Sequence, residues 1–255
     1  MSTAAIEPSA VTDAHRKQFE EQGYFILESV IPQEHVEMLR EECAKAIDLI
    51  HADMDAKGVD TIGISHRDSR YFISLYQESP RVREFLFSPV MLSICQATIG
   101  PRPYLFFEQY VIKAAEKGMK FGWHQDSGYL GPDYPPYLTC WCALDDVDEE
   151  NGTIYVLPYD RAGTRGLVAH VHDAGTNDLV GYFGDDPGIP VVVPAGSVAV
   201  FSSLVFHRSG PNTTNGIRRI YLAQYSAEPM MAADSHREWN PEGSRPWIPG
   251  SALTS

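Results

Sequence analysis

Two histidines and one aspartate have the residue types and the spacing that a mononuclear metal site needs. His124 and Asp126 stand two residues apart, and at the end of an extended strand both side chains point to the same side. A third ligand has to come from a distant part of the chain, and His207 follows the apolar run 198–206. Two imidazoles and one carboxylate on one face of an octahedron leave three positions open, which is the arrangement in non-haem iron(II) oxygenases.

The His-X-Asp pattern is weak by itself, because the sequence contains it three times. We expect the copies at 51–53 and 66–68 to occupy surface or loop positions. His170 and His172 form another candidate pair, but no third ligand accompanies them, so an exposed strand is the simpler interpretation.

An arginine eleven residues after His207 is a candidate anion ligand. A Gly/Pro/Asn turn separates the two, so we expect the strand that opens with Arg218 to lie beside the strand that carries His207. A guanidinium in that position binds a carboxylate bidentately. Arg219 is the alternative, since strand alternation lets only one of the two point inward.

The first third of the chain, residues 12–100, reads as a helical support for this site. Thr12 or Asp13 can cap a short helix that stops at Gly23, and a strand at 24–27 follows. Pro32 opens a second helix, whose apolar residues recur at three- and four-residue steps and form one buried face: Val36, Leu39, Cys43, Ile47 and Ile50. Ser88 and Pro89 make a cap and first-turn pair for a helix that ends at Gly100.

Short β-rich runs replace the helical pattern from residue 103 onward. Turn residues separate runs at 104–112, 137–144, 153–157, 191–193, 198–201 and 217–226. No helical pattern lies between successive runs, so we predict a mostly β fold, a closed sandwich or barrel with flanking helices. The core spans about 103–228, and residues 234–255 form a flexible tail.

Composition bounds the class of protein and its partners. A chain of 255 residues with 44% hydrophobic content fits one domain, 1–255. The net charge of -14 disfavours nucleic acid and anionic membranes. The beginning of the chain has no secretory pattern, and the four cysteines show no metal spacing, so we expect a cytoplasmic protein with reduced core thiols.

Three segments resemble the phytanoyl-CoA dioxygenase family of iron(II)- and 2-oxoglutarate-dependent oxygenases. The first is Trp123-His124-Gln125-Asp126, and the second is the Asn-Gly turn and strand at 151–158. The third joins His207-Arg208-Ser209-Gly210 to Arg218 with the family's spacing. The chain departs from many relatives after Pro158, where Tyr159-Asp160-Arg161 replaces Gly-Ser-His.

The resemblance implies a double-stranded β-helix, or cupin-like jelly roll, that uses iron(II), 2-oxoglutarate and O2. It assigns the metal to His124, Asp126 and His207. It assigns the cosubstrate to Arg218, assisted by the hydroxyl of Ser209, with Gln109 and Trp141 as pocket walls. Related halogenases have a small residue in place of the aspartate, so the carboxylate favours hydroxylation of a small organic metabolite, with 2-oxoglutarate converted to succinate.

Several questions stay open at this level. Candidate substrate contacts, each of which can equally be core or a solvated connection, are Tyr129, Tyr134, Tyr137, Phe206 and Arg67. The segments 127–137 and 61–71 are candidate lids. The alternatives to hydroxylation are desaturation, cyclisation or epimerisation by the same chemistry, and a catalytically silent binding barrel. The oligomeric state is a monomer or a homodimer.

Overall fold

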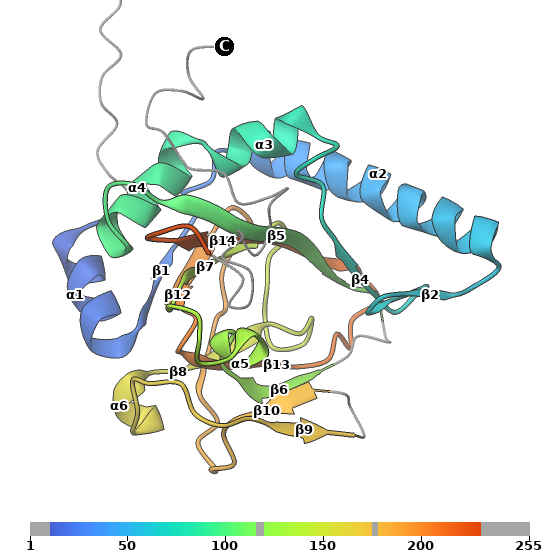
Figure 1. The fold of residues 1–255 in the computed structure, drawn as a ribbon. Helices are drawn as coiled ribbons and strands as arrows, with labels where there is room; N and C mark the ends of the chain where they lie inside the picture. Colours follow the sequence, from blue (N-terminus) through green and yellow to red (C-terminus); the bar gives the residue numbers. More distant parts are fainter. Residues whose placement is uncertain (1–10, 116–119, 175–177, 231–255) are drawn as a thin grey trace, which may run out of the picture.

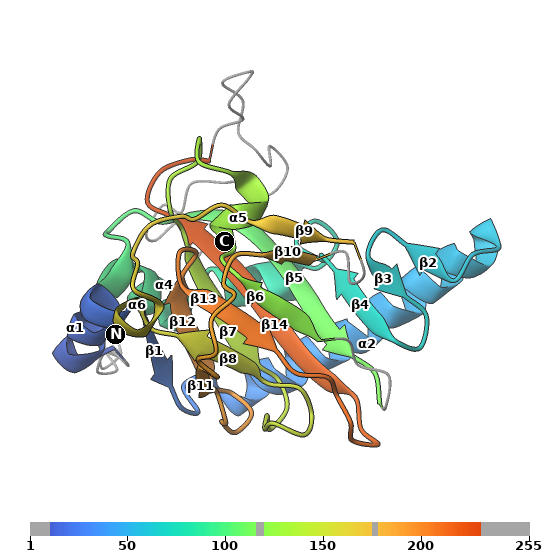
Figure 2. The same ribbon diagram turned by 90° about the horizontal axis from the view of Figure 1, so that it is seen from below.

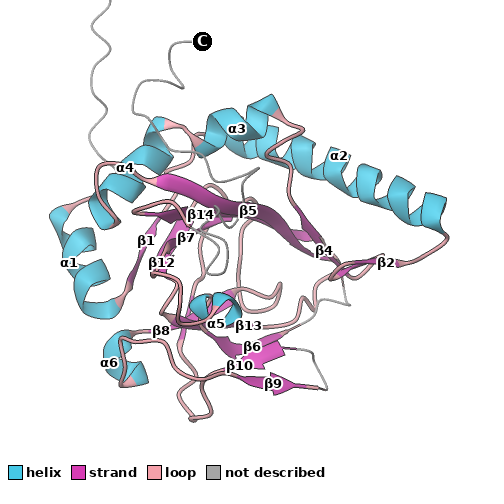
Figure 3. Ribbon diagram, in the orientation of Figure 1, coloured by secondary structure: helices cyan, strands magenta, loops and turns pink. Residues whose placement is uncertain are grey.

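Two antiparallel sheets face each other, and the main helices lie on the outer side of the larger one (Figure 1). The structure is a computed structural model that describes residues 11–115, 120–174 and 178–230. Figure 3 shows the layers by secondary structure, with helices α2, α3 and α4 along one face of the large sheet. This arrangement confirms the predicted β fold with flanking helices.

The large sheet has eight strands in the order β1-β12-β7-β14-β5-β4-β3-β2. Their bounds are β1 (Tyr24–Leu27), β12 (Val198–Ser202), β7 (Leu138–Ala143), β14 (Arg218–Ser226), β5 (Tyr104–Lys113), β4 (Arg70–Ile73), β3 (Ser65–His66) and β2 (Thr61–Ile62). The long pair β5 and β14 runs through its middle, and Figure 2 shows this pair from below, beside the smaller sheet.

The smaller sheet has four strands in the order β11-β8-β13-β6. Their bounds are β11 (Ile189–Pro190), β8 (Ile154–Leu157), β13 (Phe206–Ser209) and β6 (Phe121–His124). A separate two-stranded sheet pairs β9 (Val171–Asp173) with β10 (Asp178–Val180).

Six helices complete the part of the chain that the structure describes. They are α1 (Asp13–Gln22), α2 (Gln33–Lys57), α3 (Pro80–Leu86), α4 (Pro89–Thr98), α5 (Ser127–Leu130) and α6 (Tyr159–Ala162). The first helix has the predicted capping, since the Thr12 hydroxyl accepts from the His15 amide and Gly23 closes the helix with a φ of 85°. No helix in this part of the chain is both long and apolar enough to cross a bilayer.

Alternation along the central strands divides the interior into two layers. On β7, Cys140 and Cys142 face the core under the helices, while Trp141 faces the second core between the two sheets. On β14, Tyr221 faces the helices and Ile220 the space between the sheets. Because both faces are covered, these strands are buried at nearly every position.

The predicted strand at 198–201 is present as β12, and the apolar run 198–206 continues through a turn to the start of β13 in the small sheet. One expectation about the arrangement of the strands was wrong. The strand that opens with Arg218 does not lie beside the one carrying His207, since β14 pairs with β5 and β7. Ser88 stands at the N-cap of α4 and Pro89 in its first turn, as predicted, although the Ser88 hydroxyl makes no hydrogen bond.

The run 191–193 also forms no regular strand, although Val193 makes an isolated bridge with Val147. The tail at 234–255 and the first ten residues lie outside the described residues.

Candidate active site

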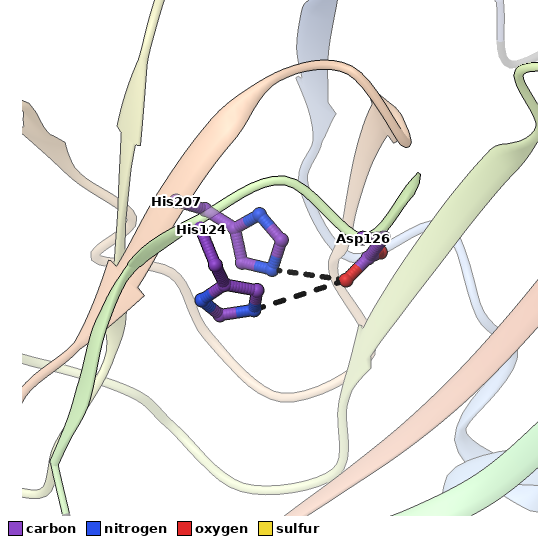
Figure 4. Close-up of side chains that lie close together, drawn as sticks. All are labelled: His124, Asp126 and His207. Atoms are coloured by element: carbon purple, nitrogen blue, oxygen red, sulfur yellow. Dashed lines mark ion pairs between the residues drawn. The ribbon is translucent and has the colours of Figure 1, made fainter. Parts of the chain in front are cut away.

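His124, Asp126 and His207 converge on one point (Figure 4). His124 ends β6 and pairs in register with His207 of the neighbouring strand β13, so both imidazoles come from the small sheet. Asp126 Oδ1 lies 3.8 Å from His124 Nε2 and 3.4 Å from His207 Nε2. One ligand atom from each residue lies within 4.8 Å of the others, so a single ion can contact all three.

Hydrogen bonds orient both imidazoles toward this point. His124 Nδ1 lies 2.8 Å from the Gly122 carbonyl, and His207 Nδ1 lies 3.2 Å from the Val205 carbonyl. A carbonyl can only accept, so each Nδ1 carries the proton and each Nε2 keeps a lone pair for a metal. Burial and the neighbouring His207 ring lower the pKa of His124 to about 4, which leaves it neutral at pH 7, the form that binds metal.

The large sheet holds the carboxylate of Asp126. Its Oδ2 accepts from Thr139 Oγ1 at 2.6 Å and from Gln224 Nε2 at 3.1 Å, and the amide also donates to the Thr139 hydroxyl. These bonds occupy one carboxylate oxygen and leave Oδ1 directed at the histidines. Sequence reasoning missed Thr139 and Gln224, because nothing in their neighbourhood distinguishes them from ordinary strand residues.

Other histidines that the sequence singled out have different partners. His51 Nε2 bonds the Tyr71 hydroxyl at 2.8 Å, and His66 Nδ1 bonds the Arg67 carbonyl at 2.9 Å. His170 Nε2 accepts from the Gln125 amide at 3.0 Å, so it supports the segment that carries the triad. Among the described residues, no second group of three has the geometry of a metal site.

Arg218 is buried at 2% exposure in the same cavity as the triad. It donates through Nη2 to the Gly152 carbonyl at 3.1 Å and through Nη1 to the Val111 carbonyl at 3.3 Å. Its Nε is buried without a hydrogen-bond partner. Burial lowers the pKa of Arg218 to about 9, so the guanidinium is charged at neutral pH. By contrast, Arg219 pairs with Asp145 and does not line the cavity, so Arg218 is the one of the two arginines that faces it.

Lys113 is a second buried cation beside Arg218, and sequence reasoning missed it. The two residues are direct partners across β5 and β14. The Lys113 ammonium donates to Ser209 Oγ at 2.8 Å and to the Gly210 carbonyl. The Ser209 hydroxyl, expected to assist Arg218, therefore contacts Lys113. Lys113 directly follows the β-rich run 104–112. A charged residue at the end of a buried strand is unusual, and this position was the feature of the sequence that could have identified it.

The Asn-Gly turn of the sequence supplies an acceptor for both cations. The Gly152 carbonyl lies 3.1 Å from Arg218 Nη2 and 3.5 Å from Lys113 Nζ. Gly152 has a φ of 85°, and a Cβ there would lie 2.8 Å from the Gly210 carbonyl oxygen. Glycine is therefore required for both the turn and the close approach of the two loops.

A cavity of about 360 Å³ between the two sheets joins the triad to these cations. Gln109 and Trp141 both line it, as the sequence interpretation expected. The rest of its wall is mainly aliphatic or aromatic and includes Ile64, Phe72, Phe106, Phe107, Phe121, Leu130 and Leu222. Ile64 and Tyr129, each 52% exposed, mark the side that faces solvent.

The candidate substrate residues divide into two groups. Tyr129 and Tyr137 line the cavity, and both lie on or beside α5 in the segment 127–137. Tyr134 packs against Tyr137 but is not part of the cavity wall, and Phe206 packs against His170 and Tyr182.

Arg67 does not reach the cavity wall that the structure describes. Its guanidinium contacts Asp55 at 2.6 Å and Asp60 at 3.2 Å. These ion pairs tie the end of α2 to the hairpin of β2 and β3. The departure at Tyr159-Asp160-Arg161 forms α6, and none of its residues lines the cavity.

Comparisons with known proteins agree with this geometry. The sequence profile described as phytanoyl-CoA dioxygenase (PhyH) matches residues 19–220. The peroxisomal phytanoyl-CoA dioxygenase of Mus musculus is 23% identical over 248 residues, which cover 90% of this chain and 72% of that protein.

Two solved structures show the same fold. EvdO2 from Micromonospora carbonacea var. aurantiaca, complexed with 2-oxoglutarate, has a TM-score of 0.66 and 21% identity, with 90% of this chain and 98% of that chain covered. The carbocyclase SnoK from nogalamycin biosynthesis has a TM-score of 0.64 and 19% identity, with 87% of each chain covered. The fold is thus the cupin-like jelly roll of the 2-oxoglutarate oxygenases. The chain belongs to the phytanoyl-CoA dioxygenase (PhyH) family of iron(II)- and 2-oxoglutarate-dependent oxygenases.

Proposed function

We propose that this protein is an iron(II)- and 2-oxoglutarate-dependent dioxygenase that hydroxylates a small organic metabolite. The observation that carries the proposal is the convergence of His124, Asp126 and His207 at one end of a cavity whose other end is cationic. Two imidazoles and one carboxylate are the donor set that suits iron(II) and leaves positions for other ligands. The helices within 12–100 and the core within 103–228 act as one oxygenase domain around this cavity.

The cosubstrate fits the end of the cavity that holds Arg218. A buried guanidinium with one nitrogen unpartnered matches the distal carboxylate of 2-oxoglutarate. Ser209 lies at the same end, and Gln109 and Trp141 form the walls between it and the triad. The 2-oxo acid group would then lie at the metal.

Bound iron(II) supplies the redox chemistry, in which substrate, O2 and 2-oxoglutarate give hydroxylated substrate, succinate and carbon dioxide. The protein orients the two organic molecules and limits the access of water. Thr139 and Gln224 fix one oxygen of Asp126, and the aromatic walls provide a low-polarity surrounding for the reacting C–H bond.

The open side of the cavity favours a substrate with an uncharged apolar surface. Its described walls there are aromatic and aliphatic side chains, with Tyr129 and Tyr137 offering hydroxyls. The limited volume, shared with the cosubstrate, favours a small free metabolite.

The test is release of succinate from 2-oxoglutarate in the presence of iron(II), ascorbate and a panel of small metabolites. The expected result is turnover that one chemical class of substrate increases and that His124→Ala abolishes. Equal turnover by His124→Ala would remove the assignment. A protein that binds iron and 2-oxoglutarate but releases no succinate with any substrate would instead be a silent binding barrel.

Cyclisation or epimerisation is the second candidate outcome. The likeness to a carbocyclase favours it, because the same fold supports that reaction in SnoK. Product mass separates the candidates, since hydroxylation adds one oxygen atom, cyclisation removes two hydrogens, and epimerisation leaves the mass unchanged.

A further inference from the structure

Lys113 and Arg218 form a pair of buried cations that no acidic side chain of the described residues neutralises. Both are 2% exposed, and they face each other across β5 and β14. Among the residues that the structure describes, neither forms an ion pair. The charge of Asp145 acts on Arg218, but the Asp145 carboxylate already accepts hydrogen bonds from Nε and Nη2 of Arg219.

A positive charge on Lys113 is unfavourable unless an anion binds beside it. Burial, and then the charge of Arg218, lower the pKa of Lys113 well below its usual range. The acceptors that Lys113 contacts are the Ser209 hydroxyl and the carbonyls of Gly152 and Gly210, all of them neutral. A bound carboxylate would relieve this cost, because it places one oxygen within reach of each cation.

Lys113 lies in the same cavity as the metal triad. Its ammonium lies 2.8 Å from Ser209 Oγ, and Ser209 is two residues from His207 on β13. Lys113, Ser209, Arg218 and His207 all line this cavity. One ligand of the cavity can therefore contact both the triad and the ammonium.

We propose that Lys113 is a second cationic partner, beside Arg218, for the distal carboxylate, and that it makes the pocket selective for 2-oxo diacids over 2-oxo monoacids. The inference rests on the proposed function, because it takes 2-oxoglutarate as the ligand. It differs from a structural role for Lys113, in which the ammonium only joins β5 to the loops at 152 and 210. A structural role would affect every ligand of the cavity equally.

The experiment measures the binding of 2-oxoglutarate and of 2-oxopentanoate, which lacks the distal carboxylate. Calorimetric titrations of the iron(II)-loaded protein without oxygen would compare the wild type with Lys113→Met and Lys113→Gln. The glutamine variant keeps a hydrogen-bond donor for the loops without the charge. Lys57→Met, an exposed lysine at the end of α2, is the matched control.

Both Lys113 variants are expected to bind 2-oxoglutarate about 10- to 100-fold more weakly, the size expected for loss of a charged hydrogen bond. Binding of 2-oxopentanoate should change little in the same proteins, and a high 2-oxoglutarate concentration should restore kcat. Equal weakening of both ligands, or unchanged binding of 2-oxoglutarate, would overturn the inference. Failure of the wild type to bind 2-oxoglutarate would overturn the proposed function itself and this inference with it.

Discussion

The two ends of the cavity are suited to ligands of opposite charge. At the metal end, defined by His124, Asp126 and His207, each ligand has its other polar atoms bonded, and three lone pairs face a common point. At the cationic end, defined by Lys113 and Arg218, two positive groups are buried among neutral acceptors. The first end is arranged to receive a cation, and the second to receive an anion.

The comparison shows how the protein divides selectivity between the sheets. The small sheet supplies the two histidines, while the large sheet supplies the cations and the residues that hold Asp126. Substitutions at the cationic end should therefore leave iron(II) binding at the metal end intact, and the following changes test this separation.

Loss of a metal ligand should have the largest effect. His207→Ala removes one of three donors, so we expect iron(II) affinity to fall by at least about 100-fold and succinate release to vanish. Metal content after dialysis and a succinate assay measure both. His172→Ala, an exposed histidine on β9, is the control and should retain iron. Retention of iron by His207→Ala would mean that the triad is not the metal site.

Loss of the guanidinium should affect only the cosubstrate. For Arg218→Met we expect the Kd of 2-oxoglutarate to rise about 100-fold, because a bidentate charged contact is removed, with iron(II) binding unchanged. Calorimetry measures both constants. Arg219→Met should lower thermal stability by breaking the pair with Asp145 but leave the Kd of 2-oxoglutarate nearly unchanged. The opposite ranking of the two variants would contradict the assignment.

Removal of a hydrogen bond that holds the Asp126 carboxylate should have an intermediate effect on iron(II) binding. Thr139→Val removes the hydroxyl that donates to Asp126 at 2.6 Å, so we expect iron(II) affinity to fall about tenfold. Thr139→Ser keeps the hydroxyl and should bind iron like the wild type. If the valine and serine variants bind iron equally, the hydrogen bond does not position the ligand.

The smallest effect is expected at another copy of the His-X-Asp pattern. His66 lies in the hairpin of β2 and β3 and is not part of the metal cluster. His66→Ala should therefore bind iron(II) and 2-oxoglutarate like the wild type in the same calorimetric titrations. A marked loss of iron would show that the hairpin contributes to the metal end.

The sequence predicted those site residues that lie close to one another in the chain. His124 and Asp126 stand at one strand end, so their convergence could be predicted without knowing the sheets. His207 and Arg218 were predicted from the spacing in the family, because the neighbouring strands expected for them are not observed. Lys113 and Gln224 could not be predicted, because their partners Ser209 and Asp126 lie more than 80 residues away in the chain. Thr139 could not either, because its contact with Asp126 depends on how the large sheet faces the small one.

The same limit explains the error in the fold. The turn between His207 and Arg218 does not reveal which strands pair, so the sequence could not show that β14 lies between β5 and β7. The ion pairs of Arg67 were also not predictable, because Asp55 and Asp60 lie in or beside other elements. The partners of polar loop residues are set by how the helices pack against the sheet edge, which the sequence alone does not reveal.

The most direct test of the whole account is a titration of 2-oxoglutarate into the iron(II)-loaded protein without oxygen, followed by visible absorption. Iron(II) chelated by a 2-oxo acid absorbs in this region, so the account predicts a band that saturates at one equivalent in the wild type and is absent from His124→Ala. A protein that holds iron but gives no band, or a band that persists unchanged in His124→Ala, would contradict it.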